Sequence, residues 1–193
     1  TAGGPKELIL GRRDGPRYDF QINLGKPVFE PGRIPIQAPA GTAVPLREFP
    51  LEIRGAVWPV TALSVGNPHA VIRRDDFDLS LIQDWGPLVE NHPAFPERAN
   101  LEIVQAIDAE TIRIGIWERG VGHTLASGTG SAAAAVACIL NGWTGRRVRV
   151  LMEGGQTLVH WAEGGPVLQD GSARLVFTGV LLLDALEEGP GAG

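Results

Sequence analysis

A glycine-rich segment that begins with two charged residues is the part of this sequence best suited to chemistry. It runs from Glu118 to Ser131 and reads Glu-Arg-Gly-Val-Gly-His-Thr-Leu-Ala-Ser-Gly-Thr-Gly-Ser. The alanine-rich run that follows stops at Asn141-Gly142, which predicts a helix over residues 129–140. Gly128 and Gly130 leave the N–H groups of the first turn uncovered, and together with the positive end of the helix dipole these groups indicate a site for a small anion, a carboxylate or a phosphate, at residues 127–131.

Three other segments carry polar groups that bear on binding. Arg119 can add a bidentate contact to the anion. The turn Gly66-Asn67-Pro68-His69 places an amide beside an imidazole, a pair able to orient a polar substrate. Arg98-Ala99-Asn100 stands just before an expected strand. Taken alone, the turn is also typical of a solvent-facing histidine, and the last segment of an exposed charge with a cap.

Other motifs fit less well. Gly128-x-Gly130-x-x-Ala133 matches a loose dinucleotide-binding fingerprint, but ten residues separate it from the preceding strand and repeating βαβ units are absent. A phosphate-binding Gly-Lys-Ser/Thr loop and a hydrolase nucleophile elbow are missing. The histidines show no metal-ligand spacing, so no metal site is expected. Cys138, inside the predicted helix, is interpreted as a small buried apolar residue.

The elements that must position these groups are mainly strands. Alternating apolar and polar residues and turn residues predict strands at 17–24, 51–54, 57–65, 70–73, 101–107, 111–117, 148–152, 157–161, 167–169 and 174–183. The strand at 57–65 is interrupted at Pro59, and residues 118–127 form a loop. A helix over 78–89 is expected to break or end early at Gly86-Pro87. This pattern favours an α+β fold with mixed sheets.

Composition sets limits on the protein class. The chain has 193 residues, 44% of them hydrophobic, and a net charge of −5, which disfavours nucleic acid as a partner. One cysteine excludes a disulfide framework. No apolar stretch is long enough to span a bilayer, so we expect no membrane partner and a cytoplasmic location. The first residue is Thr1, which fits either removal of an initiator Met or a fragment of a longer protein.

Five segments, in order along the chain, together resemble the diaminopimelate epimerase family. They are Asn23-Leu24-Gly25-Lys26-Pro27-Val28-Phe29 with Arg33-Ile34-Pro35, Val65-Gly66-Asn67-Pro68-His69-Ala70-Val71, Phe95-Pro96-Glu97-Arg98-Ala99-Asn100, the glycine-rich segment from Glu118 to Gly130, and Glu153-Gly154-Gly155 with Leu158. The resemblance implies two similar α+β lobes of mixed sheet around central helices, with the first lobe incomplete here. It implies residues 1–60 as a remnant of the first lobe and 61–173 as the second. Residues 174–185 would be a strand returning to the first lobe, and 186–193 a disordered tail.

The resemblance also implies an activity and a set of roles. The family epimerises an amino acid without pyridoxal, so no metal or organic cofactor is implied, and the partners are a small amino-acid substrate and a second copy in a homodimer. Two thiols on opposite faces of the α-carbon exchange its proton. The implied substrate-binding residues are Asn67, Asn100, Arg119, Gly128 and Thr129. The implied catalytic residues are Ser127, Glu118 and His69.

Two departures from the family keep three functions open. Ser127 stands where the family has one catalytic cysteine, and nothing in this sequence matches the segment that carries the other. A third, smaller departure is His123, where the family usually has a glutamate. The chain is therefore interpreted as an epimerase or most of one, as an inactive carboxylate-binding homologue or interaction module, or as a related lyase or isomerase that uses Ser127 on one face only.

Overall fold

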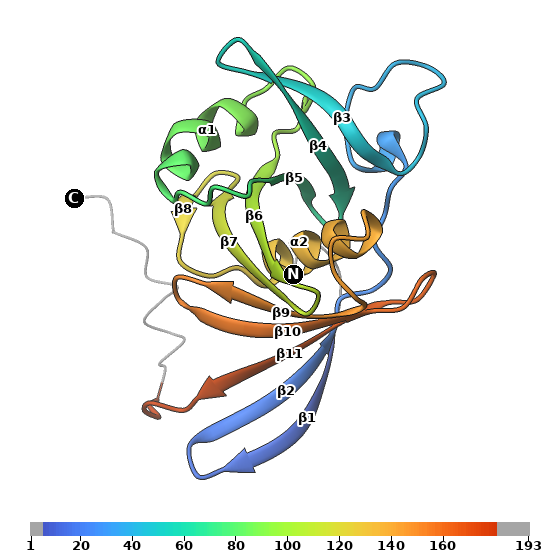
Figure 1. The fold of residues 1–193 in the computed structure, drawn as a ribbon. Coiled ribbons are helices and arrows are strands. Elements are labelled where there is room, and N and C mark those ends of the chain that lie inside the picture. Colours follow the sequence, from blue (N-terminus) through green and yellow to red (C-terminus); the bar gives the residue numbers. More distant parts are fainter. Residues whose placement is uncertain (1–5, 181–193) are drawn as a thin grey trace, which may run out of the picture.

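The structure, a computed structural model, describes residues 6–180 and contains a mixed, twisted sheet with two α-helices and one short 3-10 helix (Figure 1). The strands within this range are β1 (Glu7–Asp14), β2 (Arg17–Asn23), β3 (Leu46–Ile53), β4 (Ala56–Ser64), β5 (Pro68–Arg73), β6 (Asn100–Asp108), β7 (Thr111–Glu118), β8 (Gly122–Thr124), β9 (Arg147–Met152), β10 (Gly155–Trp161) and β11 (Val167–Arg174). The helices are η1 (Pro31–Arg33), α1 (Ser80–Glu90) and α2 (Gly128–Leu140).

Two parallel pairings give the sheet its mixed character. Its strand order is β1-β2-β11-β10-β9-β7-β6-β5-β4-β3, with β8 attached to β7. The pairs β5–β6 and β7–β9 are parallel, and the other paired neighbours are antiparallel. Each parallel pair needs a crossover connection, and each crossover holds one α-helix: α1 between β5 and β6, and α2 between β7 and β9. The predicted α+β class is confirmed.

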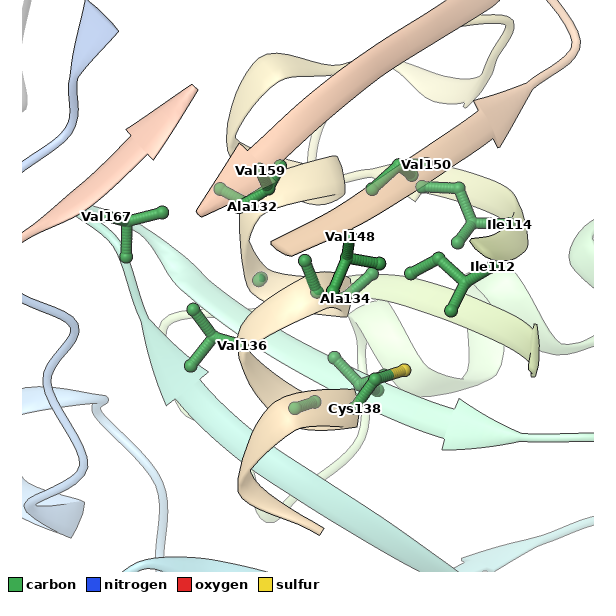
Figure 2. Packing of buried hydrophobic residues seen from close by; sticks show 14 of the residues in the cluster. Ile112, Ile114, Ala132, Ala134, Val136, Cys138, Val148, Val150, Val159 and Val167 are labelled. Carbon is green, nitrogen blue, oxygen red and sulfur yellow. The ribbon is translucent and has the colours of Figure 1, made fainter. Parts of the chain in front are cut away.

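The helix α2 lies in one of two hydrophobic clusters. Residues 130–138 are all buried, because a run of small side chains lets strands approach the helix from several sides. Figure 2 shows Ala134, Val136 and Cys138 of α2 together with Ile112 of β7 and with β9 side chains. The second cluster joins α1 to the strands β3 to β6. Both helices are thus fixed against the sheet, and the start of α2 is held from within the core.

The helix α1 does not break where the sequence predicted. It continues through Gly86 and Pro87 to Glu90. A proline at this position leaves the carbonyl of Gln83 without its helical donor, but Gln83 and Pro87 are both exposed, so water can supply the missing bond. Gly86 faces the opposite way, where a Cβ would lie 2.2 Å from the Trp117 ring. The glycine is therefore there for close packing and not as a helix breaker.

Several strand predictions were also wrong in detail. β4 runs through Pro59 without interruption, because Pro59 lies opposite Pro50 of β3 and precedes Thr61, the first residue of β4 that pairs with β5. β1 was not predicted, and β8 lies inside the segment expected to be a loop. β11 is continuous to Arg174, whereas residues 175–180 contain no strand. The rest of the strand expected at 174–183 lies outside the described residues.

The division into lobes stays a prediction. The proposed boundary between residues 60 and 61 falls within β4, and the sheet continues across it. The two hydrophobic clusters are centred on α1 and α2. The predicted tail at 186–193 and residues 181–185 of the segment 174–185 lie outside the described residues.

Candidate functional site

The first turn of α2 forms as predicted, with Ser127 as its N-cap. Ser127 has extended backbone angles (φ −146°, ψ 130°), and its Oγ accepts a hydrogen bond from the backbone N–H of Gly130 at 3.2 Å. The N–H groups of Gly128 and Thr129 come before the helical hydrogen bonds begin, and within residues 6–180 they meet no protein acceptor. The helix begins one residue earlier than predicted and presents two backbone donors at its positive end.

Asn67, His69 and Glu102 form a hydrogen-bonded line that leads to this turn. His69 Nδ1 lies 2.8 Å from Glu102 Oε1, and His69 Nε2 lies 2.9 Å from Asn67 Oδ1. Asn67 Nδ2 lies 3.5 Å from Thr129 Oγ1, at the outer limit for a hydrogen bond. Three residues of the predicted site, Asn67, His69 and Thr129, are thus brought together.

The local backbone explains this placement. Gly66 has φ +114°, a conformation that favours glycine, and it turns the chain between β4 and β5 so that Asn67 stands beside the start of β5. The parallel pairing of β5 with β6 then places His69 opposite Asn100. Because side chains alternate along a strand, Glu102 lies on the same face of β6 as Asn100. The turn and the register together set the polar line beneath α2.

Asn100 connects three segments through its side-chain amide. Its Nδ2 donates to the carbonyl of Pro68 at 2.9 Å, and its Oδ1 accepts from the backbone N–H of Arg119 at 2.8 Å. The Arg119 guanidinium donates to the carbonyl of Glu97 at 2.7 Å. In this structure Arg119 is therefore joined to Asn100 by its backbone, while its side chain contacts the segment before β6.

A carboxylate that the sequence did not suggest holds the loop after β7. Glu90, at the end of α1, accepts hydrogen bonds from Arg98 Nη1 at 3.1 Å, from Trp117 Nε1 at 2.7 Å and from the backbone N–H of Gly120 at 2.9 Å. Its side chain is only 9% exposed. These three bonds fix the chain on both sides of Glu118 and Arg119.

Glu102 is a second residue that sequence reasoning missed. It is fully buried, and burial is the main cause that raises its pKa above the usual value, with the negative charge of nearby Glu118 adding to the effect. His69 acts in the opposite direction through its charge and hydrogen bond. A glutamate inside the apolar run Leu101-Glu102-Ile103-Val104, two residues after Asn100, is the pattern that could have revealed it.

The segment before Ser127 is supported by the turn between β9 and β10. His123 Nε2 lies 2.6 Å from Glu153 Oε1, and the backbone N–H of Gly154 donates to the carbonyl of Leu125 at 2.7 Å. A Cβ on Gly154 would lie 3.0 Å from that carbonyl oxygen, so glycine permits the close approach. The histidine that departs from the family pattern thus has a carboxylate partner.

Residues outside this cluster do not add to the site. A concave region of about 750 Å³ lies over β2, β10 and β11, and none of the candidate residues lines it. Within residues 6–180, no three His, Cys, Asp or Glu side chains gather as metal ligands would, and neither α-helix is long and apolar enough to cross a membrane. Cys138 is buried, and burial raises the pKa of its thiol to about 12.

Solved structures with this fold include amino-acid epimerases and racemases. A hydroxyproline epimerase from Agrobacterium vitis, with bound trans-4-OH-L-proline, superposes with a TM-score of 0.60 at 14% identity, over 90% of this chain and 55% of that one. A probable proline racemase from Agrobacterium radiobacter superposes with a TM-score of 0.59 at 17% identity, over 97% of this chain and 60% of that one. The fold is therefore that of this epimerase and racemase class.

Sequence similarity identifies the family within that class. The family model for diaminopimelate epimerase matches residues 61–176. Diaminopimelate epimerases from Pelotomaculum thermopropionicum and Xylella fastidiosa are 47% and 45% identical to this chain over 82% and 84% of its length. The chain belongs to the diaminopimelate epimerase family, as its motifs predicted. It spans about half the length of these curated relatives, 56% in both cases.

Proposed function

We propose that this chain contributes the carboxylate-binding half of a cofactor-independent amino-acid epimerase that acts on diaminopimelate. The observation that carries the proposal is the first turn of α2, where two free backbone donors stand at the end of a polar line from β5 and β6. The family membership and the names of the relatives support the same reaction. A cytoplasmic location and a homodimer remain predictions.

In this proposal the α-carboxylate of the substrate binds to the N–H groups of Gly128 and Thr129. Loss of the α-proton puts negative charge on the substrate next to that carboxylate. Backbone donors already in place stabilise this charge without reorganising during the reaction. Asn67, Asn100 and Arg119 complete the binding of the amino acid, while His69 and Glu118 assist proton transfer.

Ser127 limits what the chain can do alone. Its position at the α2 N-cap corresponds to a family cysteine, but a hydroxyl is hardly ionised at neutral pH and is a far poorer base than a thiolate. Inversion needs one group to remove the α-proton and another to return a proton to the opposite face. The single cysteine of this sequence, Cys138, is buried inside α2. We therefore expect no appreciable inversion of diaminopimelate by this chain alone.

The test is α-proton exchange in deuterated water with LL- or meso-diaminopimelate. Ser127→Cys supplies a thiol at the cap, and Ser127→Ala is the matched variant without any acid or base. The proposal expects one-sided exchange that is fastest for Ser127→Cys and absent for Ser127→Ala. Equal rates for all three proteins would refute a proton-transfer role at this position, and clear inversion by the unaltered chain would refute the expected limit.

A second function is favoured by the N-cap itself. The Ser127 Oγ already accepts the Gly130 N–H, a structural role that serine fills well and that needs no chemistry. This supports a homologue that binds an amino-acid carboxylate without turning it over. Calorimetric binding of diaminopimelate without exchange in either the unaltered chain or Ser127→Cys would favour that function.

A further inference from the structure

Glu102 is a buried titratable group to which the proposed reaction gives no role. Its side chain has no solvent exposure, and its partner His69 is 1% exposed. Oε1 lies 2.8 Å from His69 Nδ1, while Oε2 has no hydrogen-bond partner within the part of the chain that the structure describes. α2 covers the carboxyl group so closely that a Cβ on Gly130 would lie 2.9 Å from Oε1.

The contacts of His69 allow only a few placements of its protons. Nε2 faces Asn67 Oδ1, which is an acceptor, so Nε2 carries a proton in this arrangement. Nδ1 then either donates to an ionised Glu102, as imidazolium beside carboxylate, or accepts from a protonated Glu102, as a neutral pair. The heavy-atom positions are the same in both cases.

Burial and the unpartnered oxygen favour the neutral pair. An ionised carboxylate would leave a charged oxygen, Oε2, buried without a donor, which costs more than an unpartnered carbonyl oxygen of a carboxylic acid. Three charges or dipoles face Glu102: His69 from β5, Glu118 from β7, and the positive end of α2. His69 and the helix favour the carboxylate, whereas Glu118 and the complete burial oppose it.

We propose that Glu102 is a positioning residue that stands as a neutral carboxylic acid, donates its proton to His69 Nδ1, and so fixes the orientation of the Asn67 amide. With Nδ1 occupied, the remaining ring proton is on Nε2 and is donated to Asn67 Oδ1. The Asn67 amide is then held with its Nδ2 donors toward Thr129 and the first turn of α2. This arrangement of hydrogen bonds among Glu102, His69 and Asn67 does not depend on the proposed function. Only its effect on substrate binding rests on that function.

The primary test reads the protons of His69 directly. Protein labelled with ¹⁵N-histidine is studied by NMR at neutral pH, and His69→Asn identifies the resonance among the four histidines. We expect a neutral ring with its proton on Nε2 and none on Nδ1. A ring protonated on both nitrogens, or on Nδ1 alone, overturns the proposal, and this measurement needs no Glu102 variant to fold.

Two variants then distinguish a positioning role of Glu102 from a general effect on folding. Glu102→Gln retains an N–H donor toward Nδ1 and should leave the His69 spectrum unchanged. Glu102→Leu has a similar size and no donor, so the Nε2–H preference should be lost. Glu52→Gln on the exposed face of β3 is the matched control for a lost carboxyl. A spectrum that is identical in Glu102→Leu and the unaltered protein overturns the proposal.

Binding of meso-diaminopimelate, measured by calorimetry, tests the consequence for the site. Kd should rise about tenfold in Glu102→Leu, the equivalent of one misplaced hydrogen-bond donor, and should be retained in Glu102→Gln. An equal loss of affinity in both variants overturns the positioning role. If the expected His69 spectrum is found but neither the unaltered protein nor its variants bind the amino acid, the arrangement of hydrogen bonds is supported and the proposed function fails.

Discussion

Replacing Gly130 with alanine should push the start of α2 away from β6. The added Cβ would lie 2.9 Å from Glu102 Oε1, 3.1 Å from Ser127 Cβ and 3.2 Å from Ser127 Oγ. Neither neighbour can easily yield. Glu102 is fully buried and hydrogen-bonded to His69, and Ser127 is fixed by its capping bond. The first turn must therefore shift, and the cap must weaken with it.

The expected loss of stability follows from two opposing effects. Overpacking of a well-filled interior costs about 1–3 kcal/mol. Alanine is favoured over glycine in a helix by up to about 1 kcal/mol, which offsets part of that cost. Gly128→Ala is the matched control, since its Cβ meets only Gln169 Oε1 at an ordinary 3.5 Å. We expect the Gly130 variant to be less stable than the Gly128 variant by about 1–3 kcal/mol.

Urea unfolding followed by circular dichroism measures this difference. Similar m-values for the two variants would show that the comparison reports on stability alone. Equal midpoints for Gly130→Ala and Gly128→Ala would refute the reasoning, because they would mean that α2 and β6 are not packed as closely as described.

Three further outcomes test other parts of the structure. Trp117→Phe should lower the free energy of unfolding by about 1–3 kcal/mol, since the nearly buried carboxylate of Glu90 loses a hydrogen-bond donor. Trp143→Phe is the control, and an equal loss of stability in that variant would contradict this account. Cys138 should react with a thiol reagent only on addition of denaturant, because burial raises its pKa to about 12, and rapid labelling of the folded protein would contradict its placement. The raised pKa of Glu102 means that the folded state keeps this proton above pH 4.5, where the unfolded state loses it. The unaltered protein therefore loses stability as pH rises from 4.5 toward neutrality, and Glu102→Gln, which cannot ionise, should gain stability relative to it. Parallel pH profiles of stability for these two proteins would refute that assignment.

The start of α2 could be predicted because its determinants are local. Ser127 supplies a capping hydroxyl, the following residues are small, and Asn141-Gly142 ends the run. The anion-binding first turn depends on the same few residues. Local chemistry of this kind can be read from a single sequence.

The incorrect or missing predictions concern residues whose role is decided by their neighbours in the folded structure. Pro87 is tolerated because its helix face is exposed, and Pro59 because β4 has no second partner at that point. Neither condition is visible in a window of sequence. Glu90 and Glu102 were missed for the same reason, since their roles depend on hydrogen-bond partners 30 and 33 residues away.

The parallel register between β5 and β6 has a consequence for the order of folding. Hairpins such as β6–β7 and β9–β10 join residues close in sequence, and such contacts close quickly. His69 and Glu102 are 33 residues apart, and Asn67 and Thr129 are 62 apart, so they meet only after the chain has closed larger loops. A folding chain can therefore hold most of its hairpins before it can hold a ligand. Ligand binding would then be a stricter measure of complete folding than the content of β-strand.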